Sequence, residues 1–115
     1  MKLNIANYEP DRKGGGWTFA NHLANMFGNS EYSEADIYFI PSPTMASWDE
    51  VNQAKADGKK VVLRLDNAVR DTRNRGTGMS RVKGFSELAD LVIYQSQWAR
   101  DYLMPYTEVY GDVIL

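Results

Sequence analysis

Residues 59–66 read KKVVLRLD, a short run dominated by valine and leucine. Because its apolar residues follow one another instead of alternating with polar ones, the run is typical of a strand buried on both faces, as in a parallel sheet. Two further stretches have the same character, ADIYFIP at 35–41 and DLVIYQ at 90–95. Together these runs predict the centre of a parallel sheet that is covered by helices.

The segments between these runs have the apolar spacing of helices. One of them begins with a capping box, in which Ser47 is the N-cap and Glu50 is the third helical residue. Ser96 is predicted to cap the last helix, and Pro105 is predicted to end it. The predicted helices are, in order, 17–27, 48–57, 80–89 and 97–104.

Two shorter apolar stretches, at 2–7 and 111–115, complete the pattern as a first and a fifth strand. Strands and helices then alternate along the chain, with one long polar loop after the third strand. This order predicts an α/β fold, a Rossmann-like three-layer sandwich with a five-stranded parallel sheet and helices on both faces. Residues 1–115 are predicted to form this single domain.

Composition and charge exclude several classes of protein. The chain has no cysteine, which excludes disulfides and thiolate zinc sites, and no apolar run long enough to span a membrane. Its first residues read as a strand and not as a signal peptide. A formal net charge of −2 argues against a dedicated nucleic-acid partner. We therefore expect a cytoplasmic protein without a transmembrane segment, which leaves peripheral membrane contact open.

Candidate site residues follow the strands, because ligands of open parallel sheets bind beyond the carboxyl ends of the strands, near the reversal of strand order. Gly14, Gly15 and Gly16 would offer bare amides at a helix N-terminus to an anion or a sugar. The alternative is a tight turn that allows close packing. Arg64 lies just inside a buried strand, where it either contacts a ligand or pairs with an acid such as Asp66.

Four more candidates follow the third and fourth strands. Asp66 and Asn67 end the third strand, and Asp66 either contacts a ligand or caps the loop that follows. Arg70 belongs to a basic loop, which is either a solvated segment or a clamp for a phosphate or carboxylate group. Ser96 follows the fourth strand. All four are expected at the same edge of the sheet.

The usual nucleotide-binding fingerprints are absent from these positions. A dinucleotide fold requires Gly-x-Gly-x-x-Gly, but Phe19 stands in place of the last glycine. The second strand ends in Ile-Pro-Ser at 40–42, without the acid that binds a ribose, and no Gly-Lys-Ser/Thr occurs. NAD, FAD and a P-loop nucleotide are therefore not expected.

Two alternatives to an enzyme domain remain open. A phospho-receiver module has acids after the first strand, an aspartate that ends the third and a serine or threonine after the fourth. Glu9, Asp11, Asp66 and Ser96 would fill these positions and hold Mg²⁺. Such a module does not need three consecutive glycines or an arginine-rich loop. The other alternative is a plain α/β binding module whose glycines serve packing alone.

Four stretches of the sequence, taken in order, match the pattern of one family. They are KLNIANY followed by GGGWTFANHL, KKVVLRLDN followed by an arginine, ADLVIYQSQWARDYL, and YGDVIL. This ordered set resembles the N-terminal domain of GT-B glycosyltransferases of the family-4, or group-1, type. In that family a glycine-rich loop follows the first strand, a later strand carries Arg-x-Asp, and a strand of the form ADxVIxQS opens a helix.

The resemblance implies a function in sugar transfer. The family transfers a sugar from a nucleotide-diphosphate sugar to an acceptor hydroxyl, mostly without a bound metal, and we expect no cofactor. Its donor site belongs to a C-terminal domain, which we expect to be absent from this chain, so that the chain alone is inactive. The cleft residues that the resemblance implies are Gly14, Gly15, Gly16, Arg64, Asp66, Asn67 and Ser96, and loop arginines such as Arg70 would assist the departing diphosphate.

Overall fold

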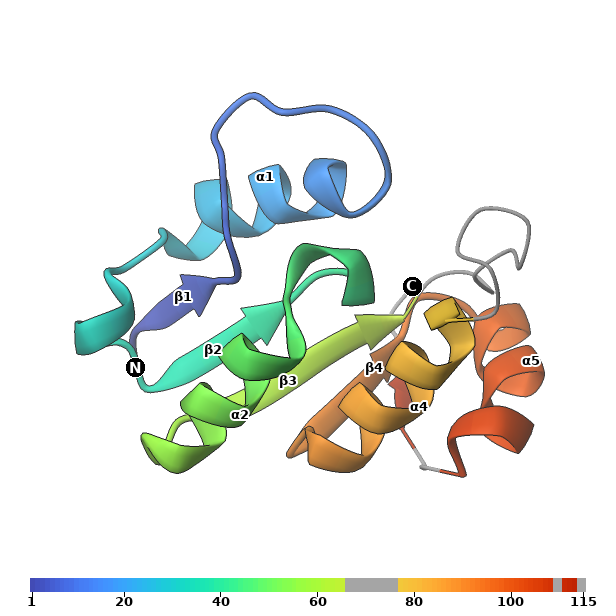
Figure 1. Ribbon diagram of the computed structural model, residues 1–115. Helices are drawn as coiled ribbons and strands as arrows, with labels where there is room; N and C mark the ends of the chain where they lie inside the picture. Colours follow the sequence, from blue (N-terminus) through green and yellow to red (C-terminus); the bar gives the residue numbers. More distant parts are fainter. Residues whose placement is uncertain (66–76, 109–110, 114–115) are drawn as a thin grey trace.

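A five-stranded parallel sheet forms the centre of the computed structural model, which describes residues 1–65, 77–108 and 111–113 (Figure 1). Each strand pairs in parallel with the strand that follows it in the chain. The strands are β1 (Leu3–Ile5), β2 (Ile37–Ile40), β3 (Lys60–Leu65), β4 (Leu91–Tyr94) and β5 (Asp112–Val113). The predicted α/β fold class is confirmed.

The helices occupy the predicted segments. They are α1 (Gly15–Phe27), α2 (Trp48–Ala56), α4 (Thr77–Leu88) and α5 (Gln97–Thr107), with short 3₁₀ helices at Tyr32–Glu34 and Pro43–Met45. The capping box at α2 is confirmed, because Ser47 Oγ accepts the Glu50 N–H at 3.1 Å and the Glu50 carboxylate accepts the Ser47 N–H at 2.9 Å. Ser96 caps α5, since its Oγ accepts the N–H of Ala99 at 3.0 Å.

The prediction that Pro105 ends the last helix is wrong. α5 continues to Thr107 with Pro105 inside it, and the N–H of Glu108 still bonds to the carbonyl of Met104 at 2.8 Å. A proline inside a helix removes one donor and crowds the carbonyl four residues before it, which destabilises the helix locally. The last turn is held from another side, because the buried hydroxyls of Thr107 and Tyr94 are hydrogen-bonded at 2.9 Å. This contact between helix and sheet outweighs the local signal to stop.

Helices pack on both faces of the sheet and form the expected three layers. α1 packs on the face that presents Leu3, Ile5 and Phe39, and Phe19 stacks on Phe39 with 5.8 Å between ring centroids. The helices α2, α4 and α5 pack on the opposite face, which holds the larger core. Buried residues of that core are Tyr38, Ile40, Val51, Ala54, Val61, Leu63, Leu65, Val82, Phe85, Val92, Tyr94, Ala99 and Leu103.

The strand order differs from the one expected for a doubly wound sheet. The described strands lie in the order β1-β2-β3-β4-β5, so the order does not reverse and β1 is at an edge. Every connection therefore moves one strand in the same direction, yet α1 lies on the opposite face from α2, α4 and α5. If those three connections follow the right-handed rule, the connection through α1 has the opposite hand.

The outer edge of β1 is covered by the segment that follows α1. The N–H of Ile5 donates to Asn29 Oδ1 at 2.8 Å, and the carbonyl of Leu3 accepts the N–H of Ser30 at 2.8 Å. The side-chain amide of Asn4 also donates to the carbonyl of Ser30, at 2.9 Å. These bonds satisfy backbone groups that an edge strand otherwise leaves open to a further strand.

Candidate functional site

The loops after β1 and β2 diverge at the carboxyl edge of the sheet. The loop after β1 leads to α1 on one face, whereas the loop after β2 leads to α2 on the other (Figure 1). In doubly wound sheets a reversal of strand order produces this divergence, and ligands bind between the two loops. Here the strand order does not reverse, and the two loops diverge because the connection through α1 has the opposite hand to the other connections. The carboxyl edge of the sheet, where the sequence predicts the site, therefore has two adjacent loops that lead to opposite faces, as in a ligand-binding doubly wound sheet.

Two structural constraints explain why glycine is needed at positions 14 and 16 of this edge. Gly14 is the N-cap of α1 with φ +100° and ψ 151°, a conformation that is essentially restricted to glycine. Gly16 lies under the loop after β2, because a Cβ there would come within 2.8 Å of Ser42 Cβ and 3.1 Å of Met45 Sδ. The alternative of a tight turn with close packing therefore accounts for Gly14 and Gly16. Contact of these glycines with a ligand stays a prediction.

Arg64 is buried at the end of β3 and joins three elements. Its Nε donates to Gln95 Oε1 at 2.7 Å, and its Nη1 donates to the carbonyl of Pro41 at 3.1 Å. The guanidinium also lies over the ring of Phe19 in α1, 4.3 Å from the ring centroid. Only 6% of the residue is exposed. Because its contacts reach Pro41, Gln95 and Phe19, Arg64 links the carboxyl ends of β2 and β4 to α1.

The remaining predicted site residues divide into two groups. Ser96 lies at the same edge, and its hydroxyl is engaged in capping α5. Asp66, Asn67 and Arg70 lie outside the described residues, as does the predicted pairing of Arg64 with Asp66. The structure thus brings Gly14, Gly16, Arg64 and Ser96 to the carboxyl ends of the strands.

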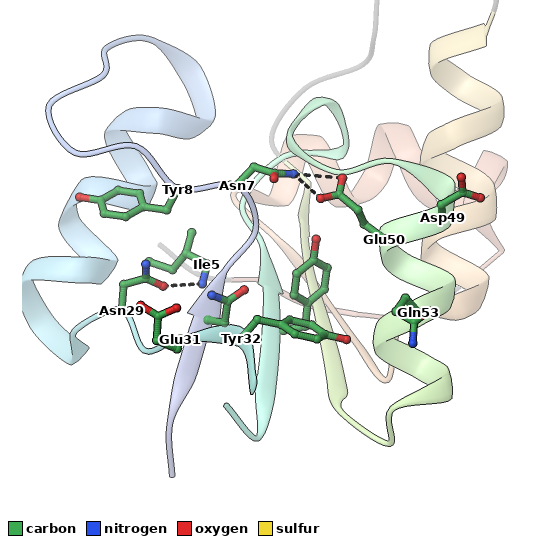
Figure 2. Close-up of a pocket in the computed structure, with 11 residues that line it drawn as sticks. Ile5, Asn7, Tyr8, Asn29, Glu31, Tyr32, Asp49, Glu50 and Gln53 are labelled. Atoms are coloured by element: carbon green, nitrogen blue, oxygen red, sulfur yellow. Dashed lines mark hydrogen bonds between the residues drawn. The ribbon is translucent and has the colours of Figure 1, made fainter. Parts of the chain in front are cut away.

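A cavity of about 610 Å³ lies beside β1, on the face of the sheet that α2 covers (Figure 2). It was not predicted, because its residues come from β1 and the loop after it, from the segment after α1, from β2 and from α2. The one motif among these segments, the capping box of Ser47 and Glu50, predicts the start of a helix and not a binding site. The lining residues are Asn4, Ile5, Asn7, Tyr8, Asn29, Glu31, Tyr32, Tyr38, Asp49, Glu50 and Gln53.

Glu50 and Asn7 close the end of the cavity that is nearest the loop after β1 (Figure 2). The Asn7 amide donates to both carboxylate oxygens of Glu50, at 3.1 and 2.9 Å, and to the carbonyl of Met45 at 2.8 Å. Burial alone would raise the pKa of Glu50, but hydrogen bonds from the Ser47 backbone, from Asn7 and from the Ser47 hydroxyl outweigh it and lower that pKa. The carboxylate is therefore ionised and fixed in place.

Tyr38 lies on β2 and lines the same cavity. The residue is only 3% exposed, and its hydroxyl has no hydrogen-bond partner within the part of the chain that is described. Burial, and then the charge of Glu50, raise the pKa of this phenol well above its usual value. The cavity thus contains a neutral buried hydroxyl with unused hydrogen-bonding capacity.

Neither a protein-family model, a curated protein nor a solved structure matches the chain. The sequence motifs and the geometry therefore carry the functional argument. In the ranges 1–65, 77–108 and 111–113, no helix combines the length and apolar character that crossing a membrane requires.

Replacement of Glu50 by glutamine is expected to reduce the loss of stability that acid causes. The folded-state pKa of Glu50 is below its unfolded value, so its contribution is complete above the unfolded pKa, about 4.3, and is lost as the pH falls through the folded pKa. Urea unfolding of both proteins at neutral pH and near pH 3 measures the difference. Equal losses of unfolding free energy in the two proteins would contradict the assignment.

Proposed function

We propose that this chain is the acceptor-side, Rossmann-like domain of a GT-B type glycosyltransferase. In this role it would form one side of a cleft in which a sugar passes from a nucleotide diphosphate to an acceptor hydroxyl. The confirmed fold class and the divergent loops after β1 and β2 support the proposal. The motif resemblance suggests the reaction, and the carboxyl edge of the sheet is the part of the domain where the proposal puts the cleft.

The N-terminus of α1 is the observation that carries the proposal. α2 and α5 are capped by the hydroxyls of Ser47 and Ser96, whereas α1 has Gly14 as its N-cap, without a side-chain cap and without an acid in its first turn. The first N–H groups of a helix have no partner inside the helix, and the helix dipole favours negative charge there. A departing diphosphate would satisfy these groups and be stabilised by them as its charge develops.

The strand order does not separate the phospho-receiver alternative from a Rossmann-like domain. Receiver-like folds have the order 2-1-3-4-5 and the Rossmann fold has the order 3-2-1-4-5-6, and both place the first strand between two others. Here β1 pairs with β2 alone among the described strands, and its outer edge is covered by Asn29 and Ser30. Glu9, one of the acids expected to bind Mg²⁺, is exposed and pairs with Arg12 at 3.2 Å.

Inorganic pyrophosphate is expected to bind weakly at α1 and to shift the amide resonances of Gly15 and Gly16. A Thr18→Glu variant places a negative charge in the exposed first turn of α1 and should weaken this binding several-fold. The matched control is Asn25→Glu, which adds the same charge near the other end of the helix and should leave the affinity unchanged. Heteronuclear NMR titration of the 115-residue chain measures both effects.

Three outcomes of the same work would count against the proposal. The first is an absence of shifts at α1, and the second is equal affinity in the two variants. The third is stable phosphorylation by a small phosphodonor and Mg²⁺, which would favour the receiver.

Incubation of the chain with nucleotide sugars and acceptors should give no transfer, because the donor site belongs to the second domain of the family. Transfer by the chain alone would contradict this division of the site.

A further inference from the structure

We propose that the cavity between β1 and α2 binds a neutral polyhydroxylated ring, such as one unit of a saccharide. This inference goes beyond the proposed function, because it concerns binding on the flank of the sheet and requires neither the N-terminus of α1 nor any transfer reaction. It rests on a buried hydroxyl without a partner, on the charge of the lining and on the rigidity of the side chains around it.

The buried hydroxyl of Tyr38 points to a ligand. Buried polar atoms in proteins are almost always hydrogen-bonded, and one that is left without a partner destabilises the folded protein. Tyr38 lines the cavity, is 3% exposed and has no partner among the residues described. Its phenol is neutral at physiological pH, since the ordinary pKa of tyrosine, 10.0, already lies well above that pH and burial raises it further. A ligand oxygen that approached this side of the cavity would supply the missing bond.

The lining of the cavity disfavours one class of ligand. It includes three acidic residues, Glu31, Asp49 and Glu50, and no lysine or arginine. Phosphorylated or carboxylated ligands are therefore disfavoured. No group of three histidine, cysteine or acidic residues suited to a metal ion occurs in the described parts of the chain. A sugar hydroxyl fits best, because it can accept a hydrogen bond from Tyr38 and donate another to a carboxylate or amide oxygen.

The side chains around the cavity are already held in position. The Tyr8 hydroxyl donates to Asn21 Oδ1 at 2.8 Å, and the Tyr32 hydroxyl donates to Asp57. Asn7 is fixed between Glu50 and the carbonyl of Met45. Because few of these groups must be ordered when a ligand binds, the entropy cost of binding is reduced.

The test is an NMR titration of the full chain with a panel of neutral mono- and disaccharides. At least one sugar is expected to shift the amide resonances of Asn4, Asn7, Glu50 and Gln53. Glucose 6-phosphate and spermidine serve as the anionic and cationic comparisons, and neither should shift the same amides. Tyr38→Phe keeps the ring and removes the hydroxyl, and it should weaken sugar binding about tenfold, the effect of one hydrogen bond.

Tyr94→Phe is the matched control. Tyr94 lies on the same face of the sheet but outside the cavity, and its hydroxyl is bonded to Thr107 at 2.9 Å. Thermal unfolding without sugar should show opposite effects, a higher midpoint for Tyr38→Phe and a lower one for Tyr94→Phe. Tyr94→Phe should leave sugar affinity unchanged.

The proposal is overturned if no sugar shifts the cavity amides, if Tyr38→Phe binds sugar as well as the parent chain does, or if a charged comparison ligand binds there instead. Failure at the cavity leaves the pyrophosphate result at α1 untouched, because the two titrations report on different amides. The two proposals can therefore fail separately.

Discussion

Replacement of Arg64 by alanine is expected to lower the free energy of unfolding by about 3 kcal/mol or more. The substitution removes a buried side chain that bonds to Gln95 and to the carbonyl of Pro41 and lies over Phe19. The carbonyl of Pro41 then loses a buried partner, and the volume of the guanidinium is left empty. Urea unfolding followed by tryptophan fluorescence measures the change.

Arg12→Ala is the control for this variant. Arg12 is exposed, pairs with Glu9 at 3.2 Å and lies over the ring of Trp17, 4.5 Å from its centroid. Exposed contacts of this kind contribute little, so its loss should cost less than about 1 kcal/mol. Arg64→Lys should lie between the two, because an ammonium group cannot reproduce the planar geometry of the guanidinium. A cost for Arg64→Ala as small as that for Arg12→Ala would mean that Arg64 does not hold the edge together.

Replacement of Gly111 by alanine is expected to destabilise the protein by about 3 kcal/mol. A Cβ at this position would come within 2.4 Å of the carbonyl oxygen of Val92 and 2.8 Å of the Tyr94 ring. The first of these contacts is with the backbone of β4, which no side-chain rotation can relieve. We therefore expect β5 to separate from β4. Hydrogen exchange of the amides in β4 and β5, together with urea unfolding, measures this loss.

Gly58→Ala separates this clash from the general effect of replacing a glycine. Gly58 has φ +77°, but nothing lies within 4 Å of a Cβ built on it, so only backbone strain of about 1–2 kcal/mol is expected. Faster exchange confined to β4 and β5 should appear in Gly111→Ala alone. If both variants lose the same stability without a local effect, the contact with Val92 is not the cause.

The sequence was sufficient to predict the elements of this fold, because their signals are local. The continuous apolar runs mark the buried strands, and the side chains of Ser47, Glu50 and Ser96 make the predicted caps. The extent of α5 was not predictable in this way, since the contact that extends it past Pro105 joins Thr107 to Tyr94 on the sheet. The position of β1 at the edge also depends on pairing between distant segments.

The candidate site was predictable only in part. The rule that ligands bind beyond the carboxyl ends of strands led to the edge where Gly14, Arg64 and Ser96 lie. The rule did not reveal that Ser42 leaves no room for a side chain at Gly16, or that Arg64 contacts Phe19. The cavity beside β1 was missed entirely. Its polar groups come from separate elements, and a lone tyrosine in an apolar strand does not show whether its hydroxyl will find a partner.

The consecutive order of the strands has a consequence for how the protein folds. Each sheet pairing joins neighbours in the chain, from β1 with β2 through to β4 with β5. A doubly wound sheet also pairs its first strand with one that follows much later in the chain, and that pairing closes a longer loop. Here each pairing closes a loop of moderate length, so the sheet can grow one strand at a time. This connectivity should give a lower contact order, and faster folding, than a doubly wound sheet of the same length.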